Sequence, residues 1–256
     1  MSKTKKVIII ILIFILIAVE GVVLSAKLNI EKLPVIENDN TNKIEKISRK
    51  KPIEMCYYDS TKTTSGLYDV AWLKLEIFGN LVSGEFDNLP AEKDSKVGTF
   101  AGTVGPLDQQ IMARHADVWW NSLAEGMKVK EELAIEFGDG SATVGFGEMV
   151  NRGDGVYVYK DKTKLSYLDQ MSQIDCEFLD EKLIVEKYIR DNIKTITIDK
   201  PVLGGSWYVV SINVVPETRT GEVTYEDGHI QSKATFTYIY NEKPQSIEVT
   251  KWEVGK

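Results

Sequence analysis

The stretch AWLKLEIFGNLVSGEF, residues 71–86, decides the fold, because apolar and polar side chains alternate on both sides of Gly79-Asn80. Such alternation is typical of strands with one buried face, and a Gly-Asn pair between two such runs predicts a hairpin. Pairing across the turn brings Lys74 against Glu85 on one face, a favourable cross-strand pair. The opposite face carries Leu73, Leu75, Ile77, Val82, Gly84 and Phe86.

A second hairpin is predicted in ELAIEFGDGSATVGFGEM, residues 132–149, where Asp139-Gly140 turns the chain. Its inner face would carry Leu133, Ile135, Phe137, Ala142, Val144 and Phe146. Between the hairpins, KVGTFAGTVG (residues 96–105) repeats glycine within a strand pattern. Repeated glycine indicates tight curvature or close backbone contact, as in a small barrel. An antiparallel meander is therefore expected from Glu54 to Tyr159.

The segment PLDQQIMARHADVWWNSLAEGM, residues 106–127, predicts a helix near residues 107–124 inserted in the meander. Pro106 opens it and Gly126 closes it. Its apolar stripe would comprise Leu107, Ile111, His115, Val118, Trp119 and Ser122. On that stripe His115 is expected to be a packed residue rather than a ligand or a base. Trp119 and Trp120 are candidates for ligand binding, but neighbours on a helix point about 100° apart, so one of them belongs to the core.

The period changes to 3.6 after Cys176, in EFLDEKLIVEKYIRDNIKTI (residues 177–196), which predicts an amphipathic helix packed on a sheet. Three or four antiparallel strands should follow, which makes the fold class α+β. The apolar stripe of this helix is Leu179, Leu183, Ile184, Tyr188, Ile189 and Ile193. The opposite face, expected to be solvated, carries Glu181, Lys182, Glu186, Lys187 and Arg190.

One of only two histidines lies in TYEDGHIQS, residues 224–232. Asp227-Gly228 has the sequence of a type I′ turn, in which both central residues have positive φ. This turn would pair Tyr225 with Ile230 and place Glu226 opposite His229, where the carboxylate favours the charged imidazole. Glu226 and His229 therefore join His115, Trp119 and Trp120 as ligand-binding candidates.

The N-terminus, MSKTKKVIIIILIFILIAVEGVVLSAK, combines three lysines with an apolar run over residues 7–26. That run is long enough to span a bilayer, and the alternative is a cleaved signal peptide. Leu24-Ser25-Ala26 is a poor cleavage site, which favours an uncleaved anchor. The lysines place residues 1–6 in the cytoplasm and the rest of the chain outside, on the cell membrane or, if the signal is cleaved, secreted.

After the anchor, residues 27–52 lack sustained periodicity and read as a flexible linker. The meander with its helix then occupies residues 53–175, and the helix with its strands occupies residues 176–256. Residues 1–52 hold 10 of the 31 Lys and Arg and 5 of the 38 Asp and Glu, which leaves a formal charge of about −12 on the remainder. So acidic a surface excludes nucleic acid as a partner.

Cys56 and Cys176 both lie in the exported part, where an oxidising compartment allows a disulfide. The alternative is two separate buried thiols. Two cysteines and two histidines without C-x-x-C or H-E-x-x-H spacing predict no metal site, and no cofactor motif is present.

The sequence LGGSWYVVS (residues 203–211) followed by VTYEDGHIQ (residues 223–231) resembles the ends of uncharacterised membrane-anchored or secreted bacterial proteins, a group without a known activity. The strands before Tyr159 are loosely similar to calycin barrels, which include the lipocalins.

No G-x-S-x-G or G-x-x-x-x-G-K-[ST] motif is present. We therefore expect a membrane-tethered, extracytoplasmic, non-catalytic binding or structural module of the bacterial cell envelope. The alternative is a lipocalin-like carrier of a small apolar ligand, ahead of a carboxylate-dependent hydrolase. The expected partners are the membrane, through the N-terminal helix, and a protein or envelope component.

Overall fold

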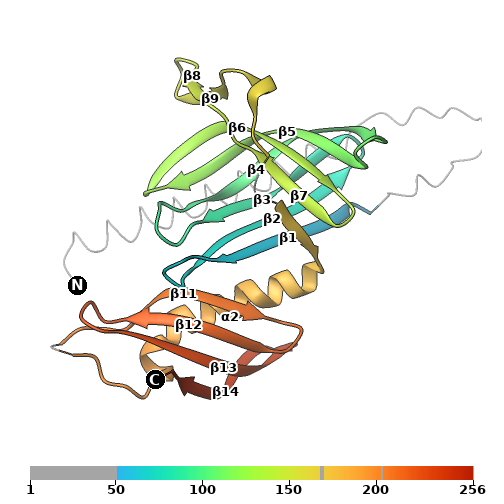
Figure 1. Cartoon of the computed structure of the whole chain (residues 1–256). Coiled ribbons are helices and arrows are strands. Elements are labelled where there is room, and N and C mark those ends of the chain that lie inside the picture. Colours follow the sequence, from blue (N-terminus) through green and yellow to red (C-terminus); the bar gives the residue numbers. More distant parts are fainter. Residues whose placement is uncertain (1–50, 168–169, 203, 256) are drawn as a thin grey trace, which may run out of the picture. The chain divides into compact units, whose positions relative to one another are not determined.

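The computed structural model describes residues 51–167, 170–202 and 204–255 (Figure 1). The predicted cytoplasmic segment, the anchor and all but the last two residues of the linker lie outside these ranges. Among the described residues, no helix combines the length and apolar character needed to cross a membrane.

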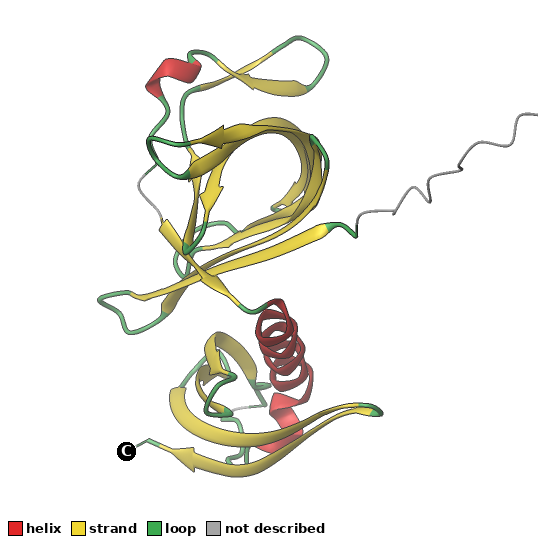
Figure 2. Ribbon diagram, turned by 90° about the vertical axis from the view of Figure 1, so that its right-hand side faces the viewer, coloured by secondary structure: helices red, strands yellow, loops and turns green. Residues whose placement is uncertain are grey.

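Eight antiparallel strands close into a barrel, because β5 pairs with β6 in addition to the continuous order from β5 through β1, β10 and β7 to β6. Figure 2 shows this closure. The barrel strands are β1 (Ile53–Lys62), β2 (Tyr68–Phe78), β3 (Leu81–Leu89), β4 (Lys96–Asp108), β5 (Ala113–Ala124), β6 (Met127–Gly138), β7 (Ser141–Gly145) and β10 (Gln170–Ile174). The expected small barrel is confirmed. A hairpin of β8 (Met149–Asn151) and β9 (Val156–Tyr159) and a 3-10 turn, η1 (Lys162–Lys164), lie between β7 and β10.

The first predicted hairpin is confirmed residue by residue. Lys74 lies opposite Glu85, and the inner face pairs Leu73 with Phe86 and Leu75 with Gly84. Gly79 has φ of +65°, which the turn requires and which glycine adopts without strain.

The second hairpin has the predicted register, with Ile135 opposite Val144 and Phe137 opposite Ala142. The prediction that Phe146 points inward is wrong, because β7 ends at Gly145. Phe146 instead forms an isolated bridge with Ser166 and is 39% exposed.

The predicted helix at residues 107–124 is wrong. This segment contains the end of β4, a turn and the whole of β5, which pairs with β4 on one side and β6 on the other. The sequence ARHADVWWNSLA also fits period 2, and the buried residues are Ala116, Val118, Trp120 and Ser122. Strands pair with β5 on both sides and accept and donate most of its backbone hydrogen bonds, and this tertiary pairing outweighs an ambiguous local pattern.

Side chains fill the interior of the barrel. The inward-facing core includes Tyr57, Leu73, Leu75, Ile77, Val82, Phe86, Phe100, Val118, Trp120, Leu133, Ile135 and Phe137. Phe86 and Trp120 contact each other with ring centroids 5.0 Å apart. The Tyr57 hydroxyl donates to the Gly138 carbonyl at 2.9 Å, which ties β1 to the end of β6. An eight-stranded barrel is just wide enough to be packed in this way.

The glycines of β4 allow close backbone contact, as their repetition predicted. A Cβ at Gly102 would lie 2.2 Å from the Asp117 carbonyl oxygen, whereas one at Gly105 would lie 3.6 Å from its nearest neighbour, the His115 carbonyl oxygen. We expect Gly102→Ala to lower the free energy of unfolding by about 1–3 kcal/mol, because the two strands must separate. Urea unfolding would measure this change in the free energy of unfolding, with Gly105→Ala as the control in the same strand. Equal costs for the two variants would contradict the close-contact explanation.

The C-terminal unit is a helix followed by four antiparallel strands, as predicted. Helix α2 (Cys176–Ile196) packs against β11, and the sheet order is β11-β12-β13-β14. The strands are β11 (Tyr208–Val215), β12 (Thr220–Glu226), β13 (Gln231–Glu242) and β14 (Gln245–Val254). The core between helix and sheet includes Val185, Ile189, Ile193, Trp207, Ile212, Tyr225 and Phe236. The barrel and this sheet are separate sheets rather than one.

Helix α2 is buried on two sides, so the expectation of a solvated charged face is wrong in part. Leu179 packs with Val70 and Trp72 on the outer wall of the barrel, while Ile189 packs on the C-terminal sheet. Glu181, Lys182 and Glu186 lie between these contacts and are buried, whereas Lys187 and Arg190 stay exposed. Helical periodicity predicts one apolar face, and it does not predict that the barrel wall covers a second face of the helix.

Candidate functional site

The three candidates on β5 do not form a common site. His115 points outward, half exposed, with Nε2 at 3.5 Å from the Glu136 carboxylate, so it is not on a packed apolar stripe. Trp120 belongs to the barrel core, as expected for one of the two tryptophans. Trp119 points outward, and Lys130 lies 5.6 Å from its ring centroid. Adjacent residues of a strand face opposite sides, which separates the tryptophans.

The predicted pairing of Glu226 with His229 is wrong by two residues. Glu226 pairs with Gln231 and Tyr225 with Ser232, so the loop has four residues rather than two. The reason is the Asp227 side chain, which accepts hydrogen bonds from the backbone amides of His229 and Ile230 at 2.8 and 2.9 Å. These bonds form a turn of their own.

Asp227 also joins this turn to the segment before β11. Its second carboxylate oxygen accepts a hydrogen bond from the Val202 amide at 2.5 Å. Hydrogen bonding by the backbone at Ile230, and then at Val202 and His229, holds the pKa of Asp227 below its usual range. The TYEDGHIQS stretch is therefore a structural turn.

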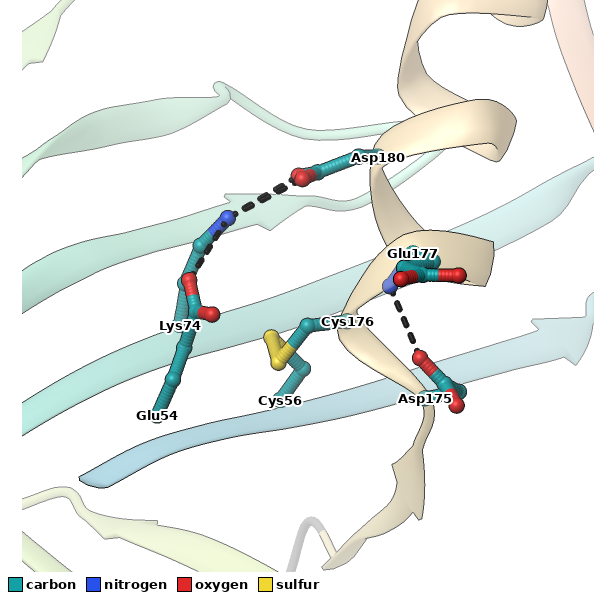
Figure 3. A network of polar contacts seen from close by, with 7 residues as sticks. All are labelled: Glu54, Cys56, Lys74, Asp175, Cys176, Glu177 and Asp180. Atoms are coloured by element: carbon teal, nitrogen blue, oxygen red, sulfur yellow. Dashed lines mark hydrogen bonds and ion pairs between the residues drawn. A yellow bond between two sulfur atoms is a disulfide. The ribbon is translucent and has the colours of Figure 1, made fainter. Parts of the chain in front are cut away.

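The predicted disulfide is confirmed between Cys56 on β1 and Cys176 at the start of α2, with Cα atoms 5.2 Å apart (Figure 3). The helix begins here because the Asp175 side chain accepts a hydrogen bond from the Glu177 amide at 2.9 Å. Lys74 on β2 forms an ion pair with Asp180 at 3.1 Å and another with Glu54 at 3.1 Å. These contacts fix the first turn of the helix on the barrel wall.

Lys182, two turns into α2, is the most unusual side chain among the described residues, because it is charged and only 2% exposed. Its Nζ donates to the Asn213 side-chain oxygen at 2.9 Å and to the Val214 carbonyl. It also lies 4.3 Å from the centroid of the Tyr58 ring on β1. One ammonium thus contacts the barrel, the helix and the C-terminal sheet.

The carboxylate nearest to Lys182 belongs to Glu186, one turn later. The Glu186 Oε1 atom lies 3.5 Å from Nζ, an ion-pair distance, but has no hydrogen-bond partner among the described residues. Burial lowers the pKa of Lys182 and raises the pKa of Glu186, while their mutual attraction opposes both shifts. Such a buried pair is a candidate for a functional role, although structural networks perturb pKa values in the same way.

A cleft of about 400 Å³ opens beside this pair. Residues from the barrel, from α2 and from β11 line it, among them Tyr68, Leu89, Lys93, Glu186, Arg190 and Ser211. The Arg190 guanidinium donates to the Val209 carbonyl at 3.3 Å. The lining offers charges of both signs and hydroxyl groups, so it can bind a small polar molecule.

A second cleft of about 300 Å³ lies beside Tyr68, over β12 and β13. The Tyr68 amide donates to the Ser211 hydroxyl at 2.9 Å, and its own hydroxyl donates to Glu222 at 2.9 Å. Lys62 forms an ion pair with the same carboxylate at 3.1 Å. Hydrogen bonding by Tyr68 and Lys62 lowers the pKa of Glu222.

Asp87 on β3 is the carboxylate most relevant to the hydrolase alternative, because burial raises its pKa to about 6. An acid whose folded pKa is raised destabilises the folded state as pH rises from the unfolded value towards that pKa. We expect the contribution of Asp87 to the free energy of unfolding to fall between pH 4 and pH 6, so Asp87→Asn should become more stable relative to the wild type across this range. The gain at pH 7 should be about 1 kcal/mol, below the full shift because Asp87 partly faces water. Glu76→Gln, at an exposed position on the neighbouring strand β2, is the control. Identical pH profiles for Asp87→Asn and wild type would contradict the assignment.

Metal ligands do not cluster in the part of the chain that the structure describes, where no group of three His, Cys, Asp or Glu residues could hold an ion. The residues that sequence analysis missed are Lys182, Glu186 and their barrel partner Tyr58. Their sequence signal, a Lys-Glu pair four residues apart, is the same as that of many exposed helix pairs.

Comparisons with models of protein families, with curated proteins and with solved structures give no match to this chain.

Proposed function

We propose that this chain is a membrane-tethered, extracytoplasmic and non-catalytic module of the bacterial cell envelope, which binds a partner or contributes to envelope structure. One observation carries the proposal: the disulfide between Cys56 and Cys176. Disulfides persist in oxidising compartments, which suggests export, and the apolar run at residues 7–26 supplies a means of export and tethering.

The filled barrel supports a binding or structural module over a carrier. Large side chains occupy the interior, so partners would reach the outer clefts beside Tyr68 rather than the barrel centre. The Glu186 cleft offers charges of both signs and hydroxyl groups to a polar partner. Both features favour a binding role.

A topology experiment on the full chain tests this proposal. Reporter cysteines would be placed one at a time at Ser2 and at Glu92, an exposed residue between β3 and β4. A membrane-impermeant maleimide applied to intact bacterial spheroplasts should label Glu92→Cys but not Ser2→Cys. Labelling of neither residue would contradict an extracytoplasmic location. Recovery of the chain in the medium would show that residues 7–26 are a cleaved signal peptide and that the chain is secreted rather than tethered.

The second candidate function is a carrier of a small apolar ligand, and the closed eight-stranded barrel favours it. Native mass spectrometry distinguishes the two candidates. The full chain would be released from detergent in the spectrometer, and its mass would be measured before and after denaturation. A bare mass is expected if the barrel is filled by its own side chains. A small molecule that leaves on unfolding would establish the carrier instead.

A further inference from the structure

Exposed apolar side chains gather at one end of the barrel, the end that the chain enters from its N-terminal segment. Eight large apolar side chains of the described residues are at least half exposed, and six of them share this end. These six, called here the tether rim, are Ile53, Phe78, Leu81, Leu107, Ile111 and Met112, between 50% and 64% exposed. The other two are Met127 and Ile198.

The topology explains why these residues meet. In an up-and-down barrel the start of β1, the β2–β3 turn and the β4–β5 turn lie at the same end, because consecutive strands run in opposite directions. Ile53 pairs with Ile77, the residue before Phe78, and Phe78 pairs with Leu81. The Val104 amide on β4 donates to the Asn80 carbonyl at 2.9 Å, which holds the two turns together.

The tether rim has an apolar groove and no cover among the described residues. Pro52, Phe78, Leu81 and Ala101 line a groove of about 330 Å³ there. The C-terminal sheet contacts the barrel at the opposite end, through Lys62 at the end of β1. Apolar patches of this kind mark surfaces that bind proteins or membranes.

The chain that leads to the rim identifies the occupant. Residues 43–51, KIEKISRKK, carry five Lys or Arg and one Glu and run directly to Pro52 on the rim. Basic residues beside apolar ones favour anionic lipid surfaces. The net charge of about −12 on the rest of the chain would repel such a surface, but salt screens charges beyond about 10 Å, so the basic residues next to the rim dominate there. The sequence of residues 27–52 predicts a flexible linker that starts at the end of the apolar run, and a linker of that length would span on the order of 30 Å. A rim tethered in this way would have a high effective concentration at the bilayer.

We propose that the tether rim inserts into the anionic outer surface of the same membrane that holds residues 7–26, so that the barrel stands on the bilayer by its apolar end. This inference rests on the proposed function, because it needs the tether. Apolar side chains at such an interface reach about 5–10 Å into the boundary between headgroups and acyl chains. The opposite end of the barrel and the clefts beside Tyr68 then face away from the membrane.

Site-directed spin labelling of the full chain tests the inference. The native cysteines are joined in a disulfide, so a nitroxide can be attached selectively at Met112→Cys on the rim and at Met127→Cys at the opposite end. These two methionines are matched, with exposures of 64% and 61%. The chain would be reconstituted in vesicles of phosphatidylethanolamine and phosphatidylglycerol, and collisions would be measured with oxygen and with a water-soluble nickel chelate.

The expected result is that the label at residue 112 collides more with oxygen and less with nickel than the label at residue 127. When Phe78→Ser and Leu81→Ser are added, the collision rates of the label at residue 112 should shift towards those of the label at residue 127. Both replaced side chains are exposed, so an unchanged melting temperature would show that the fold survives.

Each other outcome overturns the inference in a distinguishable way. Equal collision rates at both positions in chains that float with the vesicles would leave the tether intact and rule out the rim contact. Shielding of residue 112 from both reagents, with dipolar broadening between labels, would identify a second copy as the occupant. Chains that do not float with the vesicles would overturn the tether and the rim contact together.

Discussion

Replacement of both Cys56 and Cys176 by alanine should lower the free energy of unfolding by about 5 kcal/mol, the largest effect we expect from any change in this chain. The disulfide closes a loop of 120 residues, from β1 to the start of α2. Opening so long a loop restores conformational freedom to the unfolded chain, and the same bond holds the helix against the barrel wall.

Urea unfolding of residues 51–256, followed by tryptophan fluorescence, would measure this effect. The wild-type protein with its disulfide reduced provides the matched control, because it lacks the bond but keeps both side chains. Reduced wild type and the double variant should unfold at the same urea concentration, well below the oxidised protein. Coincident midpoints for oxidised and reduced protein would show that packing of Leu179 against Val70 and Trp72 suffices to hold the helix.

Lys182→Met should lower the free energy of unfolding by about 3–5 kcal/mol, since it removes one partner of a buried ion pair. The Glu186 carboxylate would remain buried without its cation, and the Asn213 oxygen and the Val214 carbonyl would lose their donor. A buried acceptor or charge without a partner retains the cost of its desolvation.

Two further variants make this expectation specific. Lys187→Met, on the same helix, removes an exposed lysine paired with Asp191 and should cost less than about 0.5 kcal/mol. The double variant Lys182→Met with Glu186→Leu should recover most of the lost stability, because apolar side chains of similar volume can replace a buried pair. If Lys182→Met costs no more than Lys187→Met, the network is not a determinant of stability.

The prediction of an exported, disulfide-bonded, β-rich chain used signals that are local in sequence. Gly79-Asn80 and Asp139-Gly140 fix hairpin registers because a turn and its two flanking strands are contiguous, and a register error would move every apolar side chain to the wrong face. A bridge between Cys56 and Cys176 is the only disulfide that the sequence allows within the chain, since it contains only these two cysteines. The repeated glycines of β4 predicted close backbone contact from the local sequence alone.

Two of the failures occurred where a local pattern allowed two structures. Residues 107–124 fit a helical stripe and an alternating strand, and pairing of β5 with both β4 and β6 decided for the strand. At residues 227–230, Asp-Gly matched a two-residue turn, but the Asp227 side chain bonded two backbone amides and lengthened the loop. In both cases the deciding hydrogen bonds join groups whose partners the local periodicity does not specify.

By itself, the sequence determined most of the alternating strands, the two hairpin registers of the barrel, the amphipathic helix at residues 177–196 and the one bridge that two cysteines could form. Each of these depends on residues within one turn or one period or on simple elimination. Only the tertiary structure decided that the strands close into a filled barrel, that Lys182 and Glu186 are buried, and that six apolar residues form one rim. These features arise when segments far apart in sequence come into contact. How far a side chain is buried from water then depends on neighbours that the local sequence pattern does not specify.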